Sequence, residues 1–280
     1  MATGRPNKIY RACCWQLPLL TCLFATPSLS GGDSEPLPED MVYIAAGPFT
    51  RGIDDPRASV DERTARQVYL SAFYLGKFEV THAQFKAFVE ATGYLSTAEE
   101  DGAVEKQDGI SWRHPGGPGA EIADRPDHPV VYVSWYDAQA YCSWKGQRLP
   151  TEAEWEKGAR GEDGRLWPWG NEYDRSLANS WGEDGYPETA PVGTFPLGAS
   201  PAGALDLAGN VWEWCADWYD PDYYTTGPDQ DPQGPEGGTL KVLRGGSWIN
   251  HWSVLRSTNR FEVMPADRSP YIGFRCARSE

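Results

Sequence analysis

Two acidic side chains flank a Gly-Asn turn in the segment LDLAGNVWEW. Asp206 and Glu213 lie seven positions apart, with Gly209 and Asn210 between them. A hard cation such as calcium binds several oxygen atoms at roughly 2.3–2.6 Å, supplied by carboxylates and by the carbonyl groups of a curved loop. The segment is therefore a candidate calcium site. Asx turns and helix caps without a metal use the same residue types, and the residues alone leave both interpretations open.

A second group of reactive side chains follows the Gly-Gly-Ser-Trp segment near the end of the chain. Imidazole and carboxylate groups in this group could act as general acids or bases, while indole and guanidinium groups suit an aromatic, anionic ligand. The serine could equally end a strand, and the arginines could be ion-pair partners in the fold. The candidate catalytic residues are Ser247, Asn250, His251, Trp252, Arg256, Arg260 and Glu262.

Other catalytic and nucleotide-binding chemistries lack their motifs. The four histidines show no HExxH or HxxxH spacing, so a histidine-based zinc or iron site is not expected. The sequence contains no GxxxxGK[ST] or GxSxG segment, and no GxGxxG segment after a strand, so nucleotide binding and serine hydrolysis are unsupported.

Composition indicates a folded, acidic protein. The chain has 280 residues, of which 40% are hydrophobic and 13% aromatic, so a packed core in one or two domains is expected. Its formal net charge of -15 repels phosphate backbones, which argues against a nucleic-acid partner.

The first thirty residues resemble a leader. Residues 1–30 combine three basic residues and no acidic residue with a short apolar stretch and a small-residue end, which predicts a secretory signal peptide. The apolar stretch is too short for a membrane span. A disordered cytosolic tail is the alternative, and the segment before Cys22 is a poor match to a lipoprotein box. We expect a periplasmic or secreted protein, with a linker at 31–40 and one domain at 41–280.

Capping residues and apolar patterns predict an α+β fold. Thr81, Ser134 and Thr151 open three short helices, because each stands at an N-cap. Strands are expected from Met41 to Gly52, over RQVYLSAFYLGKFEV, and in KVLRGGSW and IGFRCAR near the end. Residues 96–128 show no clear period and are predicted to form a surface insertion. Long loops after Gly161 need an ordering element, and metal ions are one candidate.

Three cysteines remain beyond the predicted leader: Cys142, Cys215 and Cys276. In an oxidising compartment two of the three could pair, and their spacing does not select the pair.

A series of ordered sequence blocks resembles the formylglycine-generating enzyme family, also called the sulfatase-modifying factor family. The blocks run from Met41 to Arg278 and include RLPTEAEWEKGARG, WPWGNE, LDLAGNVWEWCADWY, VLRGGSW and IGFRCAR. The resemblance implies a variant of the C-type lectin fold with little regular secondary structure and with loops stabilised by calcium.

The same resemblance assigns two calcium sites and one disulfide. It implies side-chain ligands at Asn179, Asp184, Asp206 and Glu213, and backbone ligands at Ser180, Tyr186, Gly209 and Val211. It also pairs Cys142 with Cys276 and leaves Cys215 as a free thiol.

Copper is the cofactor that the resemblance implies but the residues oppose. Enzymes of this type hold copper(I) with two cysteines after the GGSW segment, because thiolates are soft donors. Counting forward from Ser247 puts Asn250 and Leu255 at the two cysteine positions, and counting back from Arg256 and Arg260 puts Trp252 at the second of them. No cysteine occurs between Ser247 and Arg275. Copper-dependent chemistry is therefore not expected.

Two functions from different classes follow. The first is an extracytoplasmic oxidoreductase that acts on a small molecule or peptide without the cysteine pair, resembling the periplasmic PvdO type, which oxidises a siderophore precursor. The alternative is a non-catalytic C-type lectin-like binding module. A third and weaker hypothesis is true formylglycine generation on sulfatases, with Cys215 recruited as a copper ligand.

Overall fold

The computed structural model describes residues 1, 4, 40–100, 109–117, 124–182 and 184–280. The chain divides into two units, Met1–Pro36 and Leu37–Glu280, and every element described below belongs to the second. Apart from residues 1 and 4, the predicted signal peptide at 1–30 lies outside the described residues, and so does the predicted linker at 31–40 except for residue 40. Within the described ranges, no helix is long and apolar enough to cross a membrane.

Two small antiparallel sheets are built from the first strands of the folded unit. The central strand of the first sheet is β4 (Phe73–Gly76), which pairs with β1 (Met41–Ile44) on one side and with β9 (Ala277–Ser279) on the other. The second sheet is the pair of β2 (Gly47–Arg51) and β3 (Arg66–Leu70). The beginning and the end of this unit therefore meet in one sheet.

A four-stranded sheet carries the later half of the chain. Its order is β7-β6-β5-β8, in which β5 and β8 run parallel and the other pairs antiparallel. The strands are β7 (Arg260–Val263), β6 (Lys241–Arg244), β5 (Trp212–Trp218) and β8 (Ile272–Gly273). The sequence had predicted the strands near 241 and 272 but not β5.

Three helices begin where the capping residues predicted. They are α1 (His82–Thr92), α4 (Trp135–Trp144) and α5 (Glu152–Arg160), and a complete capping box closes each N-terminus. Shorter helices and 3-10 turns connect them: α2 (Thr97–Glu100), α6 (Tyr223–Thr226), η1 (Val60–Glu62), η3 (Arg175–Leu177), η4 (Pro196–Gly198) and η5 (Trp252–Val254). The α+β prediction is confirmed.

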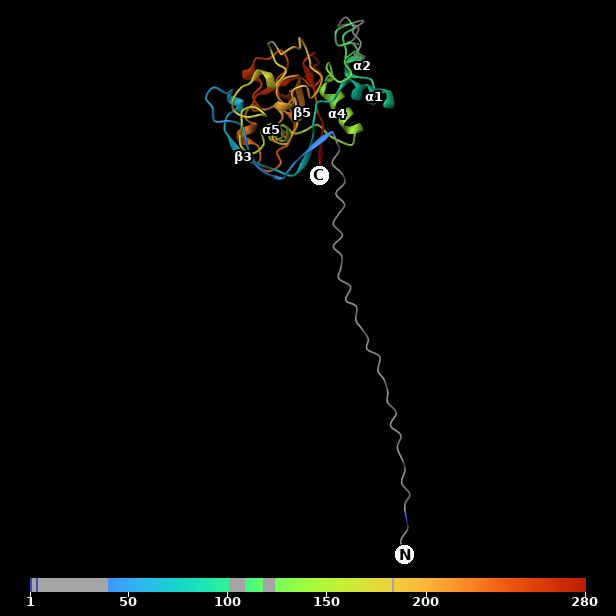
Figure 1. Ribbon diagram of the computed structural model, residues 1–280, viewed down its shortest axis with the longest axis vertical. Coiled ribbons are helices and arrows are strands. Elements are labelled where there is room, and N and C mark those ends of the chain that lie inside the picture. Colours follow the sequence, from blue (N-terminus) through green and yellow to red (C-terminus); the bar gives the residue numbers. More distant parts are fainter. Residues whose placement is uncertain (2–3, 5–39, 101–108, 118–123, 183) are drawn as a thin grey trace. The chain divides into compact units, whose positions relative to one another are not determined.

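Helix α5 is buried along its whole length. It packs against β2, β5 and β6, and Figure 1 shows it within the part of the unit that holds β3 and β5. All nine of its residues are buried, including Glu152, Glu156 and Arg160. Because buried charges require partners, the charged side chains of α5 require an ion-pair network in the interior.

An aromatic core surrounds the disulfide. Cys142 on α4 is bonded to Cys276, as the resemblance implied, and both pack with Phe85, Tyr141 and Phe274. Helices α1, α2 and α4 gather at one side of the unit in Figure 1. Such a bond fits an extracellular or periplasmic protein.

The prediction of a surface insertion at 96–128 is wrong for part of its described residues, although residues 124–127 are exposed. Trp112 is fully buried in the aromatic core, where its ring centroid lies 5.0 Å from that of Phe85. Ser96, Ala98 and Ser111 are buried as well. A single indole separated from other apolar residues gives no periodic signal, and this explains why the sequence pattern did not reveal the anchor.

Candidate functional site

The first predicted calcium site consists of Asn179, Ser180, Asp184 and Tyr186. Asn179 is 1% exposed, and its Oδ1 atom has no hydrogen-bond partner although its Nδ2 donates to the carbonyl of Glu188. The carboxylate of Asp184 accepts from the backbone N–H groups of Ser180 and Tyr186, at 2.7 and 2.9 Å. An unpartnered buried oxygen is costly, and calcium binds oxygen ligands of this kind. The loop therefore fits a calcium ion.

The second predicted calcium site, with ligands from Asp206 to Glu213, lies next to the first. Asp206 and Gly209 both have positive φ, of 61° and 86°, so the chain curls tightly here. A Cβ atom at Gly209 would lie 2.1 Å from the carbonyl oxygen of Asn179, so only glycine fits where the loops touch. Burial raises the pKa of Asp206 to about 6. The hydrogen bond that the carboxylate accepts from the Gly193 N–H opposes this rise. A bound cation would favour the charged carboxylate.

Glu213 already has a cationic partner. Its carboxylate accepts from Arg275 at 2.6 and 2.7 Å and from the indole N–H of Trp155 at 2.8 Å. A carboxylate offers about four lone-pair sites, so a calcium ion and Arg275 can share it. Among the described residues, no group of three or more His, Cys, Asp or Glu side chains could hold a metal ion. A calcium ion here would therefore need amide and backbone carbonyl oxygens as well, including those predicted at Gly209 and Val211.

Asn210 joins the two loops to a buried glutamate. Its Oδ1 accepts from Asn179 Nδ2 at 3.1 Å and from the Ala190 N–H at 2.9 Å. Its Nδ2 donates to Glu79 at 2.7 Å, and the other Glu79 oxygen accepts from the Val211 N–H. Burial and the neighbouring carboxylates raise the pKa of Glu79 well above its ordinary value. Sequence reasoning missed Glu79 because it lies 131 residues before Asn210.

Removal of calcium is expected to lower the melting temperature of the protein. A ligand that binds only the native state stabilises it, and EDTA removes that contribution. The Asn179→Ala variant lacks the unpartnered Oδ1 and should respond less to EDTA in differential scanning calorimetry. Asp163→Asn, which removes a charge from an exposed loop, is the control and should respond like the wild type. Equal melting temperatures of the wild type with calcium and with EDTA would contradict both calcium assignments.

Ser247 and Asn250 close a turn. Ser247 is fully buried, and its hydroxyl and backbone N–H both donate to Asn250 Oδ1, at 2.8 and 2.9 Å. The Asn250 N–H donates back to the Ser247 carbonyl. Both side chains therefore shape the exit of β6, and neither lines the clefts described next.

Trp252 and Tyr173 form the wall between two neighbouring clefts, with ring centroids 5.6 Å apart. The cleft on one side has a volume of about 260 Å³ and is also lined by Trp181 and His251. The cleft on the other side has a volume of about 420 Å³ and is also lined by Trp167. We call the two together the aromatic cleft, after these five of their lining residues.

Exposed and unsatisfied groups make the aromatic cleft suited to a ligand. Trp181 is 70% exposed and Trp252 is 42% exposed, so part of each indole is open to a ligand. Trp167 is only 4% exposed, yet its Nε1–H has no acceptor. Because buried donors are normally satisfied, a ligand or water acceptor is expected there. Asp184 lines the smaller cleft, so a calcium loop forms part of its wall.

Of the seven candidate catalytic residues, only three line the aromatic cleft. They are His251, Trp252 and Arg256. Sequence reasoning missed Trp167, Tyr173 and Trp181, although Trp167 belongs to the quoted WPWGNE block.

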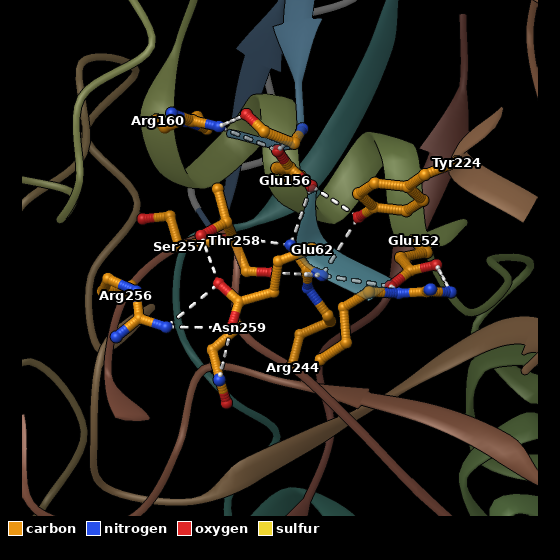
Figure 2. Close-up of polar contacts among 12 residues, drawn as sticks. Glu62, Glu152, Glu156, Arg160, Tyr224, Arg244, Arg256, Ser257, Thr258 and Asn259 are labelled. Carbon is orange, nitrogen blue, oxygen red and sulfur yellow. Dashed lines mark hydrogen bonds and ion pairs between the residues drawn. The ribbon is translucent and has the colours of Figure 1, made fainter. Parts of the chain in front are cut away.

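Arg256 is held by an ion pair at the edge of the larger cleft. Its guanidinium donates to both oxygens of Glu62, at 2.8 and 3.1 Å, as Figure 2 shows. The same carboxylate accepts from Thr258 at 2.8 Å and from Asn259 at 3.1 Å. Glu62 is fully buried, so this pair fixes the chain after η5 and leaves Arg256 little freedom to bind an anion.

Arg260 belongs to the interior network of α5. It donates to Glu152 at 2.7 and 2.9 Å, and Arg244 donates to Glu152 and Glu156 at 3.0 and 2.9 Å. Figure 2 shows Glu156 also contacting Tyr224, whose hydroxyl donates at 2.7 Å. The network is structural, which agrees with the ion-pair interpretation of the arginines.

Glu262 lies on β7, opposite Val242, and does not line the aromatic cleft. Burial raises its pKa, nearby Asp61 adds to the rise, and Arg260 opposes it. The structure therefore separates Glu262 from His251 and Trp252.

The described cysteines offer no site for copper(I). Cys142 and Cys276 form the disulfide, and Cys215 is fully buried on β5, where burial raises the pKa of its thiol. A raised thiol pKa disfavours the thiolate that a soft metal requires. The residues after Ser247 therefore do not fit the copper site that the family resemblance implied.

Three comparisons identify relatives of the chain. A family model described as "Sulfatase-modifying factor enzyme 1-like domain" matches residues 27–280. The chain is 40% identical to the formylglycine-generating enzyme of Bos taurus, over 90% of this chain and 78% of that protein. It is 36% identical to "Inactive C-alpha-formylglycine-generating enzyme 2" of Mus musculus, over 93% of this chain and 92% of that protein.

A solved structure agrees with these matches. PvdO from Pseudomonas aeruginosa superposes with a TM-score of 0.71 and 31% sequence identity, over 86% of this chain and 94% of that one. Fold, motifs and relatives point to the same conclusion: the chain belongs to the sulfatase-modifying factor, or formylglycine-generating enzyme, family.

Proposed function

We propose that this family member binds a small molecule or peptide with an aromatic group in the aromatic cleft, outside the cytoplasm. The observation that carries the proposal is the group of aromatic side chains, Trp167, Tyr173 and Trp252, that lines a cleft of about 420 Å³. Trp252 and Tyr173 offer faces for stacking, and the largely buried ring of Trp167 packs against both of them. Apolar walls with a few fixed polar groups are typical of ligand sites.

The proposal excludes formylglycine generation by the copper-dithiolate route. The segment between Ser247 and Arg275 contains no cysteine, and Cys215 is fully buried in another strand. Asn250 is engaged by Ser247, and Leu255 is buried and apolar. No pair of thiolates can therefore form where the family resemblance places copper.

Oxidation of the bound ligand is the second candidate function. The 40% identity to a bovine enzyme and the similarity to PvdO favour it. His251, which is exposed in the smaller cleft, is the candidate acid or base. The similarity to an inactive mouse relative favours binding without catalysis. Oxygen uptake by the purified protein with a bound aromatic substrate would support oxidation, and binding without uptake would support the non-catalytic module.

The Trp252→Ala variant is expected to weaken ligand binding. With N-acetyltyrosinamide as the probe, the loss of one stacking face should raise the Kd by about tenfold. The matched control is Trp144→Ala, because Trp144 is 44% exposed, against 42% for Trp252, and lies on α4. Isothermal titration calorimetry measures both. Unchanged affinity in Trp252→Ala, or no binding to the wild type in a wider screen of aromatic amides and acids, would count against the proposal.

A further inference from the structure

A separate cavity of about 150 Å³ lies beside Trp248. None of its lining residues lines the aromatic cleft. Its volume is well above the roughly 10–15 Å³ that one water molecule requires. It therefore has room for a small organic molecule.

His82 is the unsatisfied group of this cavity. It is 2% exposed, and its Nδ1 atom has no hydrogen-bond partner. The neighbouring His128 differs, because its Nδ1 lies 2.9 Å from the hydroxyl of Thr189. Burial lowers the pKa of His82 to about 3, and His128 and Arg125 lower it further, so the ring is neutral. A neutral imidazole donates from one ring nitrogen and accepts at the other, so the His82 side chain that lines the cavity can share a hydrogen bond with a ligand.

The other lining groups define the chemistry of that ligand. Arg125 pairs with Glu188 at the edge, where their side chains are 44% and 52% exposed, so both can rearrange. Tyr132 adds a hydroxyl group, and the remaining walls are apolar or aromatic: Pro115, Val131, Trp248 and Pro270. The indole N–H of Trp248 donates to the Pro270 carbonyl, which leaves its ring, not its N–H, for the ligand.

We propose that this cavity binds a small molecule with a carboxylate group and a compact apolar body, the carboxylate lying toward His82 and Arg125. The lining combines the polar side chains of His82, Arg125, Tyr132, Glu188 and Thr189 with proline, valine and indole surfaces, so it offers partners to both parts of such a molecule. Charge-assisted hydrogen bonds are the strong ones in such a site. The site is distinct from the aromatic cleft and does not depend on the function proposed for it.

Titration of the full-length chain with benzoate tests the proposal, and benzyl alcohol is the matched uncharged probe. Isothermal titration calorimetry should show saturable benzoate binding, at least about tenfold tighter than that of benzyl alcohol because the carboxylate is recognised. Arg125→Gln, at an exposed position, should weaken benzoate binding about tenfold and leave benzyl alcohol unaffected. His82→Phe should remove benzoate binding without the loss of the folded state.

The control is Arg278→Gln, which removes the same charge from β9 and should bind benzoate like the wild type. Absence of saturable benzoate binding would mean that water alone fills the cavity, and would overturn the proposal. Equal affinities for benzoate and benzyl alcohol, or unchanged benzoate affinity in Arg125→Gln, would do the same. Should His82→Phe fail to fold, the Arg125→Gln result decides.

Discussion

The Arg244→Met variant is expected to lose about 3–5 kcal/mol of unfolding free energy, because removal of one partner leaves buried charges uncompensated. Arg244 is fully buried and donates to both Glu152 and Glu156, which are 2% and 0% exposed. Arg260 still pairs with Glu152, and Arg160 still pairs with Glu156, so the variant retains part of the network. Each carboxylate nevertheless loses one of its two cationic partners.

Urea denaturation followed by tryptophan fluorescence measures this loss. A stability of about 5–15 kcal/mol is ordinary for a native protein, so the variant should unfold at much lower urea. Arg57→Met is the control: Arg57 pairs with Asp55, but its side chain is 86% exposed, so no measurable change is expected. A midpoint for Arg244→Met equal to that of the control would show that the buried network contributes little to stability.

Loss of the disulfide is expected to have a comparable effect. The Cys142→Ala/Cys276→Ala double variant opens a link between residues separated by 134 positions. In the loop-entropy model such a link contributes about 4–5 kcal/mol, mostly by restricting the unfolded chain. Both sulfur atoms lie in the aromatic core, so the two alanines also lose packing.

Chemical denaturation in the presence and absence of a reducing agent tests this expectation. The wild type should lose stability on reduction, and the double variant should not respond. Cys215→Ala is the control, because Cys215 is buried but unbonded, and its response to reduction should match that of the wild type. If reduction leaves the unfolding midpoint of the wild type unchanged, the expected contribution of the disulfide is contradicted.

Local signals in the sequence predicted the helices correctly. Thr81, Ser134 and Thr151 stand at helix starts with a partner three residues later, and all three capping boxes formed. Such interactions span one turn and need no information from the rest of the chain. The disulfide was different, because spacing left the pairing open and only the family resemblance selected Cys142 and Cys276.

Contacts between residues far apart in the sequence could not be predicted in the same way. Strand β5 was interpreted only as the end of a calcium loop, because its WEWC segment is buried on both faces and shows no polar alternation. The partners of Arg256 and Arg260, Glu62 and Glu152, lie 194 and 108 residues away. Nothing in the sequence around either arginine identifies such a partner, so candidate catalytic residues and structural ones looked alike.

The closing strand of the first sheet has a consequence for biogenesis. β9 pairs with β4, and just before it come Cys276 and Arg275, the partners of Cys142 and Glu213. All of these contacts are made by residues 275–279. A polypeptide emerging from a ribosome or a translocon therefore cannot complete this fold until residues 275–279 have been synthesised. A product truncated before Arg275 lacks a strand, a covalent link and a buried counter-ion at once.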